Sequence, residues 1–322
     1  MEVNPAEVAY RELAPVDEPA VNEGFNRVFG ARRSLEEWRW KYQEAPEGRW
    51  MMVAEDASGT LLAVYGAVPV RVRVDGVAVR AGQIVDVYSL PEVRRTKVFT
   101  TCYETFIRRW GNPDDLPLMF GFPGGIHYEM GLKQLLYVLL GPVPYWRRET
   151  PRVVLPRPLS GRVVEGFDEV AAGALWARAA DRYPVAAVRD PAWLRRRYTG
   201  RPGVEYLHLT VHRGGVPRAW GVARAMAPAF RWADLVWDGA ETADLAALDR
   251  AMARAARRRG CAHEELWLGG DEAAERALRQ RGWTRAAHPE DLHMVMRTFH
   301  PGVDPERLRT RLYLTMGDSD LV

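Results

Sequence analysis

Val85–Trp110, VDVYSLPEVRRTKVFTTCYETFIRRW, is the stretch of this chain that best indicates its fold. An apolar run at 83–88 predicts a strand, and Pro91 breaks it. A basic turn at 94–97 then leads into a predicted helix with apolar residues near one face. Free backbone N–H groups and the helix dipole at such a start favour a bound anion. The stretch therefore predicts a strand, an anion-binding turn and a helix in succession.

This stretch also resembles motif A of the GNAT superfamily of acyl-CoA-dependent N-acyltransferases. The frame of that motif is matched by Asp86, Pro91, Arg94 and Phe99. Arg95 and Lys97 stand where the motif has two glycines. Glycines there let the backbone approach a pyrophosphate closely. The two side chains would either pair directly with phosphate charges or fill the slot and abolish binding.

The order of predicted elements over the first 140 residues is also similar to that of the superfamily. Apolar periodicity and turn residues predict strands at 8–13, 50–54, 61–73, 77–88, 118–122 and 137–140. Helices are predicted after Asp17, where Gly30 ends the helix, and after Ser34, which opens a capping-box pattern. Further helices follow the basic turn and span 126–136.

The second half of the chain repeats the first. Tyr42, Pro46 and Trp50 recur at the same spacing as Tyr198, Pro202 and Tyr206. We therefore predict an α/β (mixed α+β) fold with two tandem GNAT-like domains, each a twisted, mostly antiparallel central sheet flanked by helices. The expected parts are an N-terminal domain at 1–150, a Pro- and Arg-rich linker at 151–162, a degenerate C-terminal domain at 163–300, and a tail at 301–322.

The second copy lacks the basic turn. Its expected strand 233–237 is followed by the acidic turn Asp238-Gly239-Ala240-Glu241, which opposes pyrophosphate binding. We expect a structural or substrate-shaping copy without a cofactor site. The acidic tail is expected to dock back on the protein. In some tandem GNAT aminoglycoside acetyltransferases the C-terminal carboxylate reaches the active site, so this resemblance makes the carboxylate a further candidate.

The resemblance also implies a site. In the family, N–H groups of a bulged strand hold the thioester carbonyl, and the following turn holds the pyrophosphate. The matching strand residues are Val87, Tyr88 and Ser89, and the matching turn residues are Arg94, Arg95, Thr96, Lys97, Val98 and Phe99. The alternative for the turn is a solvated basic loop.

Three side chains are candidates for proton transfer. Asp86 lies on the central strand as a candidate base, and its alternative is a strand-end acid paired with an arginine. Tyr128 stands where the family often has the tyrosine that protonates the departing thiolate, and its alternative is a core or groove tyrosine. His127 is a second candidate base, or a structural histidine.

Composition bounds the function. The 322 residues carry 47% hydrophobic and 27% charged residues and a net charge of +3, which gives no argument for DNA. We expect a cytoplasmic, bacterial-type protein with no signal peptide, no membrane span and two reduced cysteines, Cys102 and Cys261. Scattered histidines without ligand spacing predict no metal site.

The leading hypothesis is an N-acetyltransferase that uses acetyl-CoA as co-substrate and a small-molecule or peptide amine as acceptor. One alternative is a non-catalytic binding or scaffold protein with the same fold. Another is acyl transfer from an acidic carrier protein or an aminoacyl-tRNA, which arginine-rich faces would suit. The acceptor and the oligomeric state are left open.

Overall fold

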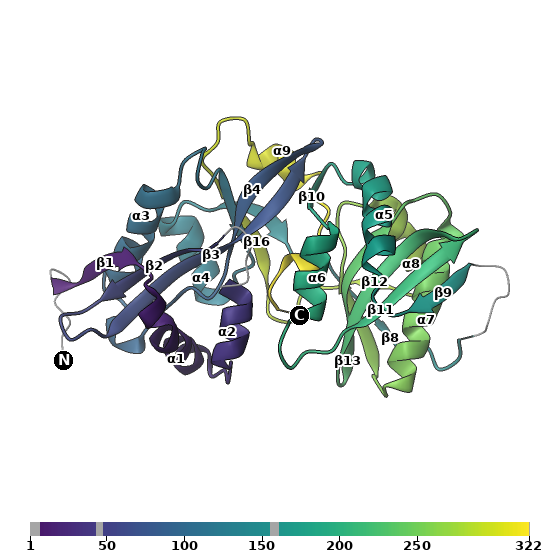
Figure 1. The fold of residues 1–322 in the computed structure, drawn as a ribbon, viewed down its shortest axis with the longest axis horizontal. Helices are drawn as coiled ribbons and strands as arrows, with labels where there is room; N and C mark the ends of the chain where they lie inside the picture. Colours follow the sequence, from purple (N-terminus) through teal and green to yellow (C-terminus); the bar gives the residue numbers. More distant parts are fainter. Residues whose placement is uncertain (1–6, 43–47, 155–160, 322) are drawn as a thin grey trace. The chain divides into compact units, whose positions relative to one another are not determined.

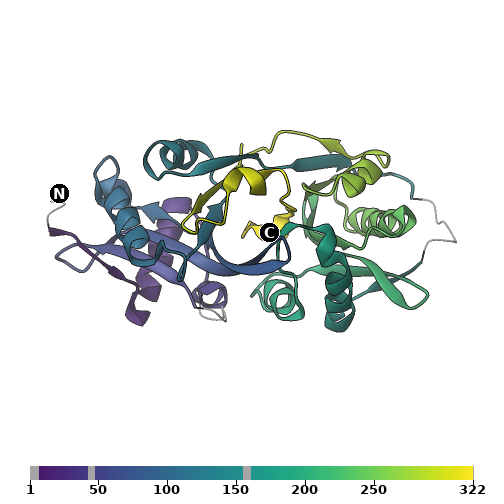
Figure 2. The ribbon, with the colours of Figure 1, turned by 90° about the horizontal axis from the view of Figure 1, so that it is seen from above.

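The computed structural model describes residues 7–42, 48–154 and 161–321 (Figure 1). The chain divides into two compact units. The first consists of Met1–Arg71, Val79–Gly141 and His293–Glu306, and the second of Val72–Ala78, Pro142–Leu292 and Arg307–Val322. Helices flank the sheet of each unit (Figure 1, Figure 2).

The first unit is built on a sheet with the order β1-β2-β3-β4-β6-β16-β7. These strands are β1 (Ala9–Glu12), β2 (Trp50–Glu55), β3 (Leu61–Val74), β4 (Val77–Ile84), β6 (Leu118–Gly121), β16 (His293–Thr298) and β7 (Val138–Pro142). β4 and β6 pair in parallel, whereas β1–β2, β2–β3 and β6–β16 are antiparallel. The β3–β4 hairpin turns at Asp75 and Gly76, which both have positive φ, as predicted.

Four helices accompany this sheet: α1 (Glu18–Phe29), α2 (Leu35–Tyr42), α3 (Val98–Trp110) and α4 (Gly125–Gln134). α1 ends at Gly30, whose φ of 63° is the left-handed conformation expected of a C-terminal glycine. The Ser34 hydroxyl accepts a hydrogen bond of 3.0 Å from the Glu37 N–H at the start of α2. Both predicted helix boundaries are therefore confirmed.

The sheet of the first unit is covered on both faces. Alternate residues of β2 divide between two cores: Met52 packs in the cluster formed with α3, and Met51 in the cluster formed with α1 and α2. This alternation follows from the two-residue repeat of a strand. Because both faces are covered, β2 is apolar from Trp50 to Ala54, and only its last residue, Glu55, is charged. The two helical layers thus hold the central sheet between them.

The second unit has the same layout, which confirms the predicted two-domain fold class. Its sheet order is β15-β8-β14-β13-β12-β11-β9, and β13–β14 is a parallel pair. The strands are β9 (Arg162–Glu165), β11 (Leu207–Arg213), β12 (Val216–Met226), β13 (Ala229–Trp237), β14 (His263–Trp267), β8 (Tyr145–Glu149) and β15 (Thr284–Arg285). Its helices are α5 (Glu169–Ala179), α6 (Pro191–Thr199), α7 (Thr242–Arg258) and α8 (Glu272–Arg279).

The two halves of the chain exchange one strand each. β8 follows the first half in sequence but pairs with β14 and β15 of the second sheet. β16 follows the second half but pairs with β6 of the first sheet. Residues 145–149 and 293–298 therefore lie in the opposite units from those that the boundaries at 150 and 163–300 assigned to them. The alternation of apolar and polar residues along a strand does not specify which strand it pairs with, so the sequence pattern could not reveal the exchange.

The remaining short elements are β5 (Tyr88–Ser89), β10 (Val185–Ala187) and α9 (Pro305–Arg309). β10 pairs with Val72–Val74 at the end of β3, within the second unit. α9 lies in the predicted tail. Of the predicted linker 151–162, residues 155–160 lie outside the described residues.

Candidate active site

The central strand of the first unit breaks near its end. The sequence predicted one strand over 83–88, but β4 ends at Ile84 and β5 begins at Tyr88. The prediction is wrong here because Asp86 has a φ of 53°, which turns the chain out of the extended path. β4 pairs with β6 at Gly82 and Gln83, whereas β5 pairs with β3 alone among the described strands.

This break exposes a backbone donor on one side of the strand. Leu90 donates its N–H to the Leu62 carbonyl of β3 over 2.8 Å. Because successive N–H groups of a strand point to opposite sides, that of Ser89 points away from β3. It faces the side on which β5 has no strand partner in the described chain. A donor placed in this way can bind a carbonyl oxygen or an oxyanion.

The basic turn follows at once. A single 3-10 turn at Pro91–Val93 leads to four exposed residues, Arg94 to Lys97, before α3 begins. Thr96 closes the turn: its hydroxyl donates to the Val93 carbonyl over 2.7 Å and accepts from the Val98 N–H over 3.2 Å. Arg95, which stands where motif A has its first glycine, has a φ of 70°. The backbone thus keeps a glycine-like conformation despite the arginine side chain.

The turn carries unpaired donors and charges. The N–H groups of Arg95, Lys97, Phe99 and Thr100 meet no acceptor in the part of the chain that the structure describes. The side chains of Arg94, Arg95 and Lys97 likewise form no ion pair with any described residue. Several free N–H groups, a helix N-terminus and three cations together form a site for a multiply charged anion.

Asp86 is held by three side chains. Arg33 donates to one carboxylate oxygen, Tyr42 to the same oxygen over 2.5 Å, and Lys41 to the other over 2.7 Å. Burial alone would raise the pKa of Asp86, but Lys41 and Arg33 outweigh it and hold the pKa below its usual value. A carboxylate that is ionised and already paired is a weak base near neutral pH. These contacts favour the alternative reading, an acid paired with an arginine.

Tyr128 lies on α4 with a side chain that is half-buried. Its ring stacks on the His293 ring of β16, with centroids 4.2 Å apart and planes 14° from parallel. Its hydroxyl makes no hydrogen bond with the residues that the structure describes. The stacking fixes the Tyr128 ring, and its hydroxyl can therefore donate a proton to a ligand.

His127 is placed differently. Its ring lies edge-on to Phe99, 6.0 Å between centroids, and 6.2 Å from Tyr137. Burial lowers the pKa of His127 to about 4. The imidazole is therefore neutral near pH 7 and too weakly basic to gain a proton readily, which favours the structural reading over the base.

The comparisons with known proteins agree with this geometry. Residues 9–132 match the sequence profile of a family described as acetyltransferase (GNAT) domain. They form a GNAT domain. Among curated protein sequences, none matches this chain.

Solved structures similar to the whole chain share the GNAT domain's fold. A GCN5-related N-acetyltransferase from Anabaena variabilis has a TM-score of 0.69 and 12% identity, covering 91% of this chain and 73% of its own. A conserved protein of Enterococcus faecalis V583, described as a probable N-acyltransferase, has a TM-score of 0.70 and 13% identity, covering 91% and 72%. N-myristoyltransferase of Saccharomyces cerevisiae with bound myristoyl-CoA has a TM-score of 0.63 and 12% identity, covering 95% and 89%. At these identities the likeness shows the fold.

Sequence reasoning missed the residues around Asp86 in the GNAT domain. Arg33 and Tyr42 lie far from the motif in sequence and reach Asp86 from the two ends of α2. One signal could have found them: the interval between Arg33 and Tyr42 is repeated between Arg189 and Tyr198, the residues that meet Asp234 in the second copy.

In the second unit, side chains of the same unit lie against the turn that is equivalent to the basic turn. Asp238 pairs with Arg218 over 3.1 Å and accepts from the Ala240 N–H. A side chain at Gly239, where φ is 75°, would overlap the guanidinium of Arg182. Arg182 in turn pairs with Asp271 over 3.0 Å. Arg182 thus lies against the loop that is equivalent to the basic turn, and a second arginine, Arg218, neutralises Asp238 of that loop.

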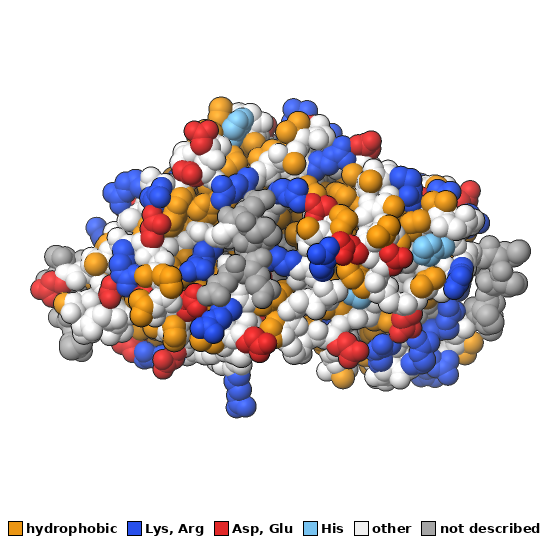
Figure 3. Space-filling model, in the orientation of Figure 1, with side chains coloured by type: hydrophobic (Ala, Val, Ile, Leu, Met, Phe, Trp, Pro, Cys, Tyr) orange, Lys and Arg blue, Asp and Glu red, His pale blue; other side chains and the backbone are white. Residues whose placement is uncertain are grey.

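Other features bear on ligands and partners. Within the described ranges, no group of histidine, cysteine and acidic residues is arranged to hold a metal, and no helix is long and apolar enough to cross a membrane. Cys102 and Cys261 are buried and free. On the face in Figure 3, basic side chains lie among acidic and hydrophobic ones. That mixture differs from the basic stripes of nucleic-acid-binding proteins.

Proposed function

We propose that the GNAT domain transfers an acyl group from acyl-CoA to an amine. The observation that carries the proposal is the unpaired basic turn at the start of α3, which lies next to a broken central strand with a backbone donor at Ser89. The likeness to an N-myristoyltransferase bound to myristoyl-CoA supports an acyl-CoA co-substrate. Acetyl-CoA is the simplest donor and the one that we propose.

The turn residues would hold the CoA pyrophosphate. The N–H groups of Lys97, Phe99 and Thr100 would donate to phosphate oxygens at the helix N-terminus. Arg95 and Lys97 would add charge pairing in place of the close backbone contact that glycines allow. Their exposure lets both side chains turn towards a ligand, which favours binding over a filled slot.

The chemistry follows from the strand break and from Tyr128. A neutral amine attacks the thioester carbonyl, a C–N bond forms, and the C–S bond breaks. The N–H group of Ser89 would stabilise the oxyanion that develops on the carbonyl oxygen. The Tyr128 hydroxyl would donate its proton to the leaving thiolate and regain one from the attacking ammonium through solvent. Asp86 stays outside this transfer because its oxygens are paired.

The second unit would bind no CoA. Its turn is acidic and Arg182 lies over it, so we propose that this degenerate copy supports the fold and shapes the protein without a cofactor of its own.

Replacing Tyr128 by Phe tests the catalytic part of the proposal. We expect turnover of acetyl-CoA with an amine acceptor to fall by about 10²- to 10⁴-fold, as for loss of a general acid, while acetyl-CoA affinity and the melting temperature stay unchanged. Tyr10→Phe removes a phenol from β1 of the same unit as a control and should leave turnover intact. Equal turnover in wild type and Tyr128→Phe would remove Tyr128 from the mechanism. Binding without turnover for any amine would favour a binding or carrier-protein role.

A further inference from the structure

The two units contain the same buried cluster of an arginine, a tyrosine and an aspartate. In the first, Arg33 and Tyr42 both donate to Asp86. In the second, Arg189 and Tyr198 both donate to Asp234, each at 3.0 Å. The arginine precedes the second helix of its unit and the tyrosine lies near that helix's end, so the clusters are equivalent positions of the repeat.

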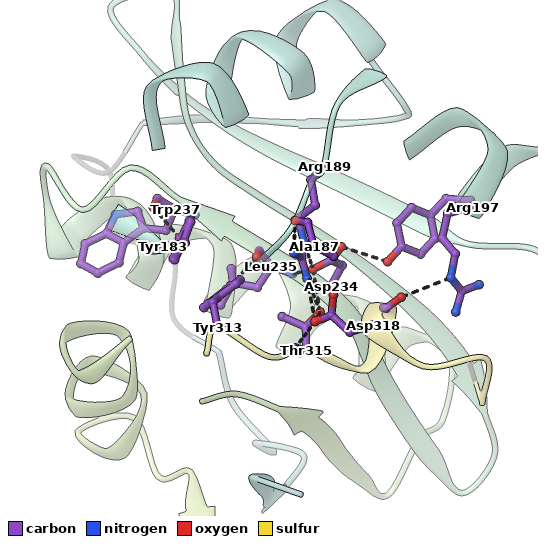
Figure 4. A network of polar contacts seen from close by, with 12 residues as sticks. Tyr183, Ala187, Arg189, Arg197, Asp234, Leu235, Trp237, Tyr313, Thr315 and Asp318 are labelled. Carbon is purple, nitrogen blue, oxygen red and sulfur yellow. Dashed lines mark hydrogen bonds and ion pairs between the residues drawn. The ribbon is translucent and has the colours of Figure 1, made fainter. Parts of the chain in front are cut away.

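In the second unit every nitrogen of the guanidinium has a hydrogen-bond acceptor (Figure 4). Arg189 directs Nε to Asp234 and Nη1 to the Ala187 carbonyl. Its Nη2 donates to both oxygens of Asp318, at 3.0 and 2.9 Å, and to the Thr315 hydroxyl at 2.9 Å. Asp318 comes from the tail, so the expected docking of the acidic tail is borne out at this residue. The buried arginine is thus paired with two carboxylates.

In the first unit one position is vacant. Arg33 directs Nε to the Asn22 side chain at 2.8 Å and Nη1 to Asp86. Its Nη2 is buried and has no hydrogen-bond partner among the residues that the structure describes. The side chain is 7% exposed and packs over the Phe25 ring at 3.8 Å, so bulk solvent does not replace the missing acceptor. A buried charged donor without a partner is costly.

We propose that Arg33 Nη2 binds a carboxylate carried by the substrate, as Arg189 Nη2 binds Asp318. The proposal rests on the proposed acyl transfer and narrows its substrate class. Asp86, the anchor of Arg33, directly precedes residues 87–89, which would hold the thioester carbonyl. A carboxylate on Arg33 therefore belongs to a group close to the reacting carbon.

That carboxylate can come from either reactant. An amine acceptor such as an amino acid or a short peptide carries one, and so does an acyl group derived from a dicarboxylic acid. Both present the same chemistry to the guanidinium, which binds carboxylates through charge-assisted hydrogen bonds. A neutral amide in the same place keeps the shape and loses the charge. We expect at least a tenfold preference for the acid.

The key variant is Arg33→Lys, which keeps a cation beside Asp86 and removes the forked donor pair. Arg32→Lys makes the same change on the exposed neighbour and serves as the control. Thiol release from acetyl-CoA would be measured with free amino acids and with their carboxamides. Succinyl-CoA would then be compared with acetyl-CoA. A calorimetric titration of the full chain with glutarate, without any CoA, measures carboxylate binding independently of acyl transfer.

The proposal predicts a preference for the free acids over the carboxamides if the acceptor carries the carboxylate, and for succinyl-CoA if the acyl group does. Arg33→Lys should reduce that ratio to about one, and Arg32→Lys should preserve it. Glutarate binding that is lost in Arg33→Lys supports the site even if no acyl transfer is found. No preference in either pair of substrates, together with no glutarate binding, overturns it.

Discussion

Asp318→Asn is expected to destabilise the second unit markedly. Asp318 and Arg189 are 4% and 0% exposed, and breaking such a buried ion pair costs about 3–5 kcal/mol. Arg189 keeps its bond to Asp234, and asparagine keeps one oxygen for the Thr315 N–H, so we reduce the figure to about 2–3 kcal/mol. For a unit of this size, each kcal/mol lowers the melting temperature by about 2–4 °C. The expected loss is therefore about 4–12 °C.

Thermal unfolding followed by tryptophan fluorescence measures this loss. Asp181→Asn is the matched control, because it makes the same change in the same unit at an ion pair with Arg73 whose acid is 88% exposed. Exposed pairs contribute about 0–1 kcal/mol, so the control should melt within a few degrees of wild type. If Asp318→Asn melts as the control does, the tail does not stabilise the second unit through Arg189.

Two further changes test individual residues. Burial lowers the pKa of His208 to about 4. When the pH falls below the ordinary histidine pKa of about 6.5, His208 becomes protonated in the unfolded chain but stays neutral in the folded chain. His208 therefore lowers the free energy of unfolding by about 2 kcal/mol between pH 7 and pH 5. In urea unfolding, the free energy of unfolding should fall between pH 7 and pH 5 by about 2 kcal/mol less in His208→Gln than in wild type. An equal fall in both proteins would contradict a lowered pKa for His208. Arg95 has a φ of 70°, which glycine adopts easily and a β-branched residue does not. In the same assay we expect Arg95→Gly to be nearly neutral and Arg95→Val to be destabilising by about 1–2 kcal/mol. Equal effects of the two variants would contradict a left-handed conformation at Arg95.

The second unit fills with its own side chains the two positions at which we propose that the GNAT domain binds ligands. Arg182 lies over the turn that is equivalent to the proposed pyrophosphate site, and Asp318 accepts hydrogen bonds from Nη2 of the buried Arg189. Asp318 neutralises Arg189, and Arg218 neutralises Asp238 of the turn. Because these charged groups of the second unit pair within the protein, they need no ligand as a partner. This agrees with a structural role for the second unit.

Much of the fold could be predicted because it depends on local signals. The basic turn and the helix that follows it, up to Trp110, follow from Pro91, the charges and apolar periodicity. Gly30 and Ser34 mark helix boundaries through their backbone and capping chemistry. The repeat of Tyr42 as Tyr198 correctly indicated a second copy.

The rest depends on contacts that sequence patterns do not carry. The exchange of β8 and β16 is a choice of partner, and both strands look alike in either sheet. The break at Asp86 was hidden within an apolar run, because a single positive φ leaves no trace in periodicity. The pairing of Asp86 with Arg33 joins residues far apart in the chain, so its occupied oxygens could be seen only in the structure. The catalytic assignment of Tyr128 stays a prediction.

Calorimetric titration with acetyl-CoA tests the central claim most directly. Wild type would be compared with Arg95→Glu/Lys97→Glu and with Arg108→Glu/Arg109→Glu, which makes the same charge change at the opposite end of α3. We predict saturable binding for wild type and for the control. The first double variant should bind about tenfold to hundredfold more weakly, since two cations beside the phosphates become anions. A flat titration for folded wild type, or equal affinities for both double variants, would contradict a CoA site at the basic turn.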